Sequence, residues 1–435
     1  MRFSYGLEDK PPFGHNLLYG LQWLIIALPS ILITGKIMGA VLLPDPVAQV
    51  LFLQKTTFMV GLTLLVQILW GHRLPLIVGP ASALLIGVIA SQGFAPAAVY
   101  SAIFCGGAVL SLISWAGLFG HLQRLFTPRV VAVVLLLIAF TLLPAIGDLL
   151  IDRASGTPPL QQLSFALVFI IVLFVAQRKL KGVWQATLIL WAMLIGSLLH
   201  RLLLPPQTQT APLPLPLVAG FFHDLNLQPV FAPGVLLSFA FCFLALAVND
   251  LGSIQALDDL LKPGNMPRRL NRGLLVTGLA NMLSGFTGVV GPVDFSLSPG
   301  VILSTRCASR FPLLATAVLL LALAWSPALF GLFNLVPAPV IGCVLLFILF
   351  SQVAAGLLAI GSQPESQRYT DGVIIGAAVL LGTLTSFWPP DVRHAFPTWL
   401  QPVIGNGFVV GVFAVLLLEH GIFRDSRAVT KQGEG

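Results

Sequence analysis

Long apolar runs separated by short polar segments fill most of the chain, and two of the runs are interrupted by proline and glycine. A helix that crosses a bilayer needs about 20 predominantly apolar residues. The pattern predicts twelve full spans, at 16–34, 48–70, 96–119, 128–151, 162–177, 182–204, 233–257, 272–289, 311–332, 337–360, 371–388 and 404–420. Two short, broken spans at 76–89 and 296–306 bring the predicted total to fourteen transmembrane segments.

Composition and charge support a membrane location. Hydrophobic residues make up 57% of the chain and charged residues only 9%, whereas a soluble domain carries about 25% charge. The predicted segments on the side of the N-terminus hold 18 of the 23 Lys and Arg residues, and the opposite side holds 5. Cytoplasmic loops carry this excess of basic residues. We therefore expect a multi-pass protein of the bacterial inner membrane with both termini in the cytoplasm, and no nucleic-acid partner.

An internal repeat divides the chain into two halves. Seven residues between 128 and 149 recur 209 positions later, and the matches include Pro128 with Pro337 and Gly147 with Gly356. Because each half has an odd number of spans, the halves are expected to lie in opposite orientations, with the site between them near the midplane. The predicted organisation is a first repeat at 1–204, an external linker at 205–231, a second repeat at 232–420 and a cytoplasmic tail at 421–435.

The two broken spans predict half-helices preceded by short strands. Gly-Pro-Ala-Ser at 79–82 opens one, and Ser-Pro-Gly at 298–300 opens the other, with Gly79 and Ser298 as the expected N-caps. Non-helical backbone at membrane depth is tolerated only where it is buried in protein or lines a cavity. Both N-terminal ends would then direct N–H groups into one cavity, so Ala81, Ser82 and Ser298 are candidate substrate-binding positions.

A longer motif includes the second broken span. Gly278-Leu-Ala-Asn-Met-Leu-Ser-Gly285, the segment 295–300 and Thr305-Arg-Cys-Ala-Ser-Arg310 resemble the signature region of the nucleobase–ascorbate transporters, the nucleobase–cation symporter family of xanthine and uracil permeases. The resemblance extends over most of the chain. It implies two inverted seven-span repeats, a core and a gate domain, a homodimer in the lipid bilayer, and uptake of a purine or pyrimidine base coupled to protons or sodium.

Several positions depart from that family pattern, among them Ser298 in place of an Asn and Trp23 in place of a histidine. Leu297 replaces a Gln or Glu, Asn249 replaces a Glu that hydrogen-bonds the base, and Ser253 replaces an Asp or His associated with ion coupling, while Gly300 and Thr305 are retained. A buried polar group that loses its partner costs about 1–3 kcal/mol, and Leu297 can accept no hydrogen bond. Asn249 still offers one acceptor and one donor group. These positions remain candidates for substrate binding.

The coupling ion and the stacking surface have further candidates. An ionisable residue at membrane depth is a functional hypothesis by default, and Asp250 and Asp294 are the acidic residues near the expected site. Either could carry a proton, while the alternatives are a structural pairing for Asp250 and a water-exposed position at the outer mouth for Asp294. Phe295 could stack on a planar ligand. The four cysteines lack metal-ligand spacing, so no cofactor is expected.

The favoured function is a secondary active transporter that imports a purine- or pyrimidine-like nucleobase with protons by alternating access. One alternative is an organic anion permease, benzoate- or sulfate-like, of the same inverted-repeat type. A second alternative is a divergent member that does not transport. An enzyme is disfavoured because the spans hold no clustered catalytic side chains.

Overall fold

The computed structural model describes residues 3–118, 127–204, 215–295, 297–333, 335–360 and 368–423. Part of the predicted external linker (205–214), Ser296 of the signature and 424–435 of the predicted tail lie outside the described residues.

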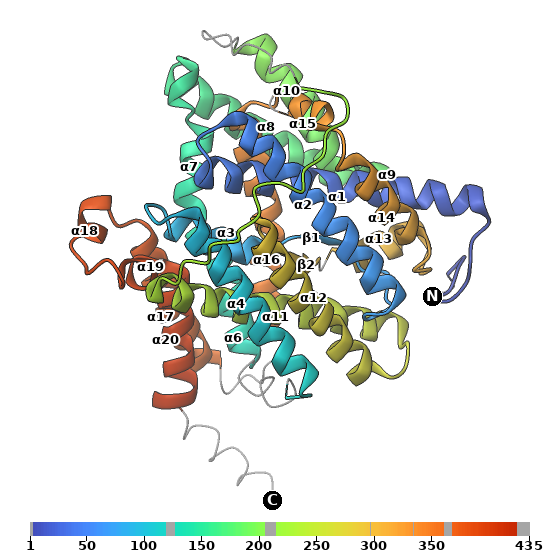
Figure 1. The fold of residues 1–435 in the computed structure, drawn as a ribbon. Helices are drawn as coiled ribbons and strands as arrows, with labels where there is room; N and C mark the ends of the chain where they lie inside the picture. Colours follow the sequence, from blue (N-terminus) through green and yellow to red (C-terminus); the bar gives the residue numbers. More distant parts are fainter. Residues whose placement is uncertain are drawn as a thin grey trace, which may run out of the picture.

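The described chain is a bundle of helices around one short pair of strands (Figure 1). The helices of the first half are α1 (Phe13–Leu42), α2 (Pro46–Leu69), α3 (Ser82–Ala90), α4 (Pro96–Trp115), α6 (Pro128–Thr141), α7 (Leu143–Leu150), α8 (Pro159–Lys179), α9 (Val183–Ala186) and α10 (Leu188–Leu203). Those of the second half are α11 (Pro233–Leu261), α12 (Met266–Thr287), α13 (Ser298–Thr305), α14 (Pro312–Leu323), α15 (Pro327–Phe333), α16 (Ala338–Ile360), α17 (Arg368–Ser386), α18 (Pro390–His394), α19 (Gln401–Ile404) and α20 (Gly407–Leu417). The predicted all-helical polytopic architecture is confirmed.

Each predicted span contains helix, but three are divided between two helices: 128–151 between α6 and α7, 182–204 between α9 and α10, and 311–332 between α14 and α15. Eight helices of the described chain are long and apolar enough to cross a membrane, and three shorter apolar ones lie at 188–203, 312–323 and 407–422. The outward side of α8 exposes Leu167, Ile171 and Val175, which recur every fourth residue. Such an apolar face suits contact with lipid. The count of fourteen crossings stays a prediction.

Proline and polar caps fix where many helices begin. Proline is favoured in the first turn because its missing N–H would have no partner there, and it is the first residue of α2, α4, α6, α8 and α11. The Asp45 carboxylate also accepts the N–H groups of Val47 and Ala48 at the start of α2. Thr127 accepts the N–H of Val130 at the start of α6.

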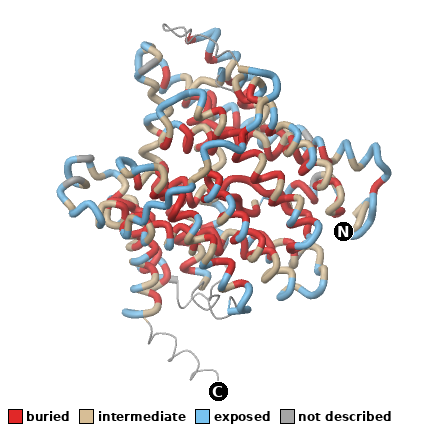
Figure 2. Tube along the Cα trace, in the orientation of Figure 1, coloured by how far each residue is buried: buried red, intermediate tan, exposed pale blue. Residues whose placement is uncertain are grey.

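The two predicted strands are present and pair with each other. β1 (Val78–Pro80) runs antiparallel to β2 (Pro292–Asp294), with Val78 opposite Asp294 and Pro80 opposite Pro292. All residues of both strands are buried, and the strands lie inside the bundle (Figures 1 and 2). Both prolines stand at the same end of the ladder, where a missing donor disrupts it least. Gly79 is required there because a Cβ at this position would overlap the Phe295 ring.

The predicted N-caps of the half-helices are wrong. Gly79 lies in β1, and the N-caps are Ala81 for α3 and Leu297 for α13, neither with a side-chain capping bond. Ser298 is the first residue of α13 rather than its cap. Strand pairing explains the difference for Gly79, because pairing with β2 keeps the backbone extended through Pro80. Helix α3 therefore starts at Ser82.

Candidate substrate and coupling site

The half-helices α3 and α13 start from opposite strands of the same pair. Beyond the ladder, the Ala81 N–H donates to the Gly291 carbonyl at 3.1 Å, and the Phe295 N–H donates to the Ile77 carbonyl at 2.8 Å. These bonds hold the start of each half-helix against the strand that leads to the other. The two N-terminal ends are therefore brought together from positions more than 200 residues apart in the sequence.

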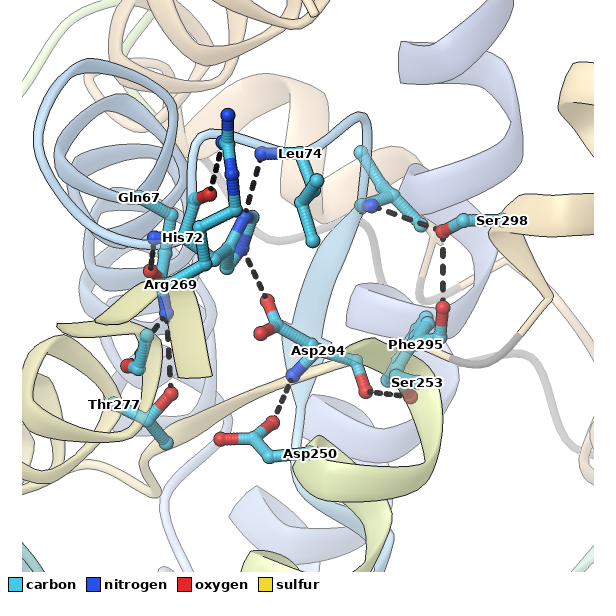
Figure 3. Close-up of polar contacts among 12 residues, drawn as sticks. Gln67, His72, Leu74, Asp250, Ser253, Arg269, Thr277, Asp294, Phe295 and Ser298 are labelled. Carbon is cyan, nitrogen blue, oxygen red and sulfur yellow. Dashed lines mark hydrogen bonds and ion pairs between the residues drawn. The ribbon is translucent and has the colours of Figure 1, made fainter. Parts of the chain in front are cut away.

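Ser298 connects the two halves through its side chain. Its hydroxyl donates to the Phe295 carbonyl at 2.9 Å and accepts the Ile77 N–H at 3.1 Å (Figure 3). Ser298 is fully buried. The hydroxyl thus satisfies a buried main-chain donor, which would otherwise cost about 1–3 kcal/mol. In this arrangement the side chain of Ser298 has a structural role.

Two predicted site residues on α11 form hydrogen bonds with the last residue of β2. The Asn249 amide donates to the Asp294 carbonyl at 2.9 Å, and the Ser253 hydroxyl donates to the same carbonyl at 3.2 Å. Residues four apart lie on one face of a helix, so both reach the same acceptor. Asn249 and Ser253 therefore fix the position of Asp294, and Asn249 keeps its amide oxygen as an acceptor group.

Asp250 and Asp294 are in direct contact. The Asp294 N–H donates to Asp250 Oδ1 at 2.8 Å, and the exposed fractions of the two residues are 0% and 1%. The alternative that placed Asp294 in water is therefore wrong. Two carboxyl groups removed from water in one place are unfavourable if both are charged. The arrangement therefore favours a proton on one of the two carboxyl groups.

His72 completes this cluster and was missed from the sequence. It follows α2, its exposed fraction is 0%, and its Nε2 lies 3.4 Å from Asp294 Oδ1 (Figure 3). Its Nδ1 accepts the Leu74 N–H at 2.9 Å. It lies in the short connection between the predicted spans 48–70 and 76–89. His72 could have been recognised as a candidate from its sequence position, because it lies just before the strand that leads to the first half-helix.

A polar network ties His72 to α2 and α12. The Gln67 side chain donates to the Gly273 carbonyl at 3.0 Å and to Thr277 Oγ1 at 3.2 Å, and its oxygen accepts the His72 N–H at 3.3 Å. Arg269 Nη1 donates to the His72 carbonyl at 2.8 Å. The imidazole is therefore held by bonds at both its ring and its backbone (Figure 3).

The remaining predicted residues are distributed around the half-helices. Ala81 is buried and Ser82 half-buried at the start of α3. Leu297 is 40% exposed, and a Cβ at Gly300 would meet nothing within 4 Å. Thr305 donates its hydroxyl to the Val301 carbonyl at 2.9 Å within α13. The Thr305 hydroxyl thus bonds within its own helix.

A cavity of about 460 Å³ lies beside α3 and is bounded by α1, α6, α7, α16 and the start of α20. It reaches α3 at Ile86, one turn beyond Ser82, and none of the predicted substrate-binding residues lines it. Its charged lining residues are Lys36, Asp148 and Arg393. The volume is within the range of small-molecule sites, about 300–1,000 Å³.

Two broken helices that meet at a buried strand pair, inside an apolar helical bundle, define a membrane transporter. The sequence profile of the permease family that includes xanthine and uracil permeases matches residues 14–391, and the chain belongs to this family. It is a family of transporters rather than of enzymes.

Individual relatives are similar over nearly their whole length. Xanthine permease XanP of Escherichia coli is 26% identical, with 95% of this chain and 93% of XanP covered. Uric acid permease PucK of Bacillus subtilis is 24% identical, with 94% and 95% covered.

Solved structures of anion transporters share the fold. The transmembrane domain of the cyanobacterial bicarbonate transporter BicA has a TM-score of 0.60 at 16% identity, with 87% of this chain and 99% of that domain covered. Murine Slc26a9 has a TM-score of 0.61 at 14% identity, with 96% and 69% covered.

Proposed function

We propose that the protein is a secondary active transporter that imports a purine-type nucleobase together with protons by alternating access. The observation that carries this proposal is the pairing of β1 with β2, which joins two half-helix N-termini to the buried Asp250 and Asp294. The family and its xanthine and uric acid permeases support a purine as the substrate. Fourteen crossings, inverted halves, cytoplasmic termini and a homodimer are part of the same proposal.

Substrate recognition would rest on main-chain groups more than on side chains. The N–H groups at the start of α3 and α13 have no partner within their own helices and carry the positive end of the helix dipole. They suit the carbonyl oxygens of xanthine or urate. The amide oxygen of Asn249 would accept one base N–H, and Phe295 would cover a face of the ring.

Uptake into proteoliposomes tests this function. The substrates are radiolabelled xanthine, hypoxanthine, guanine, urate, uracil and benzoate, each measured with and without an inward proton gradient. Gradient-dependent uptake of a purine is expected. Uptake of benzoate alone would support the second candidate function, and uptake of none of them would contradict transport of these compounds.

The second candidate function is transport of an organic anion. The observation that favours it is the cavity beside α3, where Lys36 and Arg393 supply two positive charges against the one negative charge of Asp148. The Lys36 ammonium donates to the Val336 carbonyl at 3.2 Å, which fixes it at the wall of the cavity. The same charges would also favour the anionic form of a purine such as urate, so the cavity is proposed as an entry region.

Replacing Lys36 or Arg393 by glutamine is expected to weaken urate uptake selectively. Removing one cation from this cavity should raise the KM for urate about three- to tenfold, since partly exposed charges contribute about 1 kcal/mol. The KM for neutral hypoxanthine should stay unchanged. Initial rates for both substrates measure the effect.

Asp148→Asn is the matched control, because it removes a negative charge from the same cavity and should lower the KM for urate. An equal change for urate and hypoxanthine in the lysine and arginine variants would contradict an electrostatic role.

A further inference from the structure

We propose that residues 3–10 form a strap that fixes the far end of α13, and that release of this strap weakens substrate binding at the start of the same half-helix. The inference rests on the proposed function, because it takes the start of α13 as part of the substrate site. The strap acts through the position of α13 and not by contact with the substrate.

The strap runs beside the segment that follows α13 (Figure 1). The Ser4 N–H donates to the Arg306 carbonyl at 2.8 Å, immediately after the last residue of the helix. The Ala308 N–H donates to the Tyr5 carbonyl at 2.9 Å, and Tyr5 forms a parallel bridge with Cys307. An extended segment that pairs in this way is held by its main chain, which leaves its side chains free for further contacts.

Polar contacts extend this pairing to α2. The Ser309 hydroxyl donates to the Asp9 carbonyl at 2.6 Å. The Arg310 guanidinium donates to the Glu8 carboxylate at 2.8 and 3.1 Å. It also donates to the carbonyl of Ile68, near the end of α2. The strap, the segment after α13 and the end of α2 are therefore joined at one arginine.

Apolar contacts connect the strap to α13 itself. Phe3 and Leu7 pack against the buried cluster that includes Val301 and Ile302 of α13. These two helix residues are 5% and 0% exposed. Because burial of apolar surface stabilises such a cluster, displacement of the strap would loosen the packing of the helix.

The far end of α13 depends on such contacts. The helix has eight residues, a length of about 12 Å, and its start is fixed by the Ser298 hydroxyl. One side is loosely packed, since Leu303 is 42% exposed and a Cβ at Gly300 would meet nothing within 4 Å. Arg306 ends the helix with a φ of 56°, a left-handed conformation that is uncommon outside glycine and needs surrounding contacts to hold it. The bond from Ser4 supplies one of these contacts.

Substrate binding and docking of the strap should therefore favour each other. A purine held at the start of α13 stabilises the position of this helix, which is also the position that the strap contacts. Coupling of this kind is reciprocal. If bound substrate favours the docked strap by some factor, release of the strap weakens binding by the same factor. Couplings between distinct sites are typically about 5- to 150-fold, and we expect about tenfold here.

Cys307 reports whether the strap is docked. It is 3% exposed, and its backbone pairs with that of Tyr5, so a thiol reagent should reach it mainly when the strap opens. Trypsin cuts after Arg306 and Arg310. Mass spectrometry of the peptide between these cuts therefore measures labelling of Cys307 separately from that of Cys105, which is half-buried.

The first measurement follows labelling of Cys307 in the wild type by N-ethylmaleimide, with and without saturating xanthine or urate, and needs no variant. Bound purine should slow the labelling about tenfold. No effect of a purine that the protein binds would overturn the proposal. Labelling of Cys307 as fast as a free thiol would also overturn it.

A double variant tests the reverse direction. Ser4→Pro removes the N–H that bonds Arg306, and Leu7→Asp places a charge against the apolar cluster, so the strap should be released. The dissociation constant for the purine should rise by the factor by which that purine slows wild-type labelling, about tenfold. Glu8→Gln is the matched control, because Glu8 is exposed and glutamine keeps an accepting oxygen, so both values should change less than about twofold. Wild-type affinity in a double variant that labels Cys307 as fast as a free thiol would overturn the proposal.

Failure of the proposed function gives a different result. Wild-type protein that binds neither xanthine nor urate would contradict transport of these purines. Hydrogen exchange of the α13 amides reports local opening and would still decide whether the strap fixes this helix. Exchange about tenfold faster in the double variant is expected, and equal exchange in the two proteins would overturn the proposal.

Discussion

Asp250→Asn is expected to abolish proton-driven accumulation of substrate while exchange across the membrane continues. Asparagine keeps an oxygen that can accept the Asp294 N–H at the 2.8 Å contact, so the strand pair and both half-helices should keep their positions. It cannot bind or release a proton. A gradient of about two pH units supplies about 2.7 kcal/mol per proton, equivalent to about a hundredfold accumulation, and all of this should be lost.

Steady-state accumulation and counterflow in the same proteoliposomes measure this effect. Asp258→Asn is the matched control, because Asp258 lies two turns further along α11 and is only half-buried. It should accumulate substrate like the wild type. Normal accumulation by Asp250→Asn would show that the coupled proton is carried elsewhere, and loss of both accumulation and exchange would indicate a structural role for Asp250.

The half-helices and their strands could be predicted because the residues that produce them are neighbours in the sequence. Proline and glycine at 79–80 and 299–300 interrupt two apolar runs, and non-helical backbone at membrane depth has few tolerated explanations. Asp250 and Asp294 were found for a similar reason, since acidic residues are rare in the spans.

The contacts among these elements could not be predicted from the sequence. The register that places Val78 opposite Asp294 joins residues more than 200 positions apart, and no local pattern encodes it. This register brings His72 to Asp294, and it also extends the backbone through Pro80, which moves the start of α3 beyond the expected cap. His72 follows a span in a segment that also contains Arg73, so its sequence neighbours indicate a loop although the fold buries it completely.

Arg129 is a second residue whose burial could not be predicted from the pattern of charges. It lies at the start of the predicted span 128–151, where a basic residue is expected to reach water, yet it is 7% exposed. Its guanidinium contacts Asp371 on α17 at 2.5 Å and Glu419, just after α20, at 2.8 Å. The arginine therefore connects the start of α6 to two helices from the other half of the chain. Basic residues near span ends report topology in the sequence, but only the structure shows which of them are buried.

Arg129→Met is expected to destabilise the protein by about 3–5 kcal/mol, the cost of removing one partner from a buried ion pair. Methionine retains much of the aliphatic volume but leaves Asp371 and Glu419 without the guanidinium between them. The free energy of unfolding in detergent, from denaturant titration, measures the loss. Arg201→Met is the matched control, because Arg201 is exposed and donates to a single carbonyl, that of Leu335, at 2.8 Å. Its effect should be below about 1 kcal/mol.

A triple variant separates charge from packing at this position. If the loss in Arg129→Met comes from uncompensated carboxylates, then adding Asp371→Asn and Glu419→Gln should recover most of the stability, since neutral replacements for buried ion pairs are often tolerated. If the loss comes from the missing contacts of the arginine stem, the triple variant should be as unstable as the single one. Wild-type stability in Arg129→Met would contradict any role for the cluster in holding α6, α17 and α20 together.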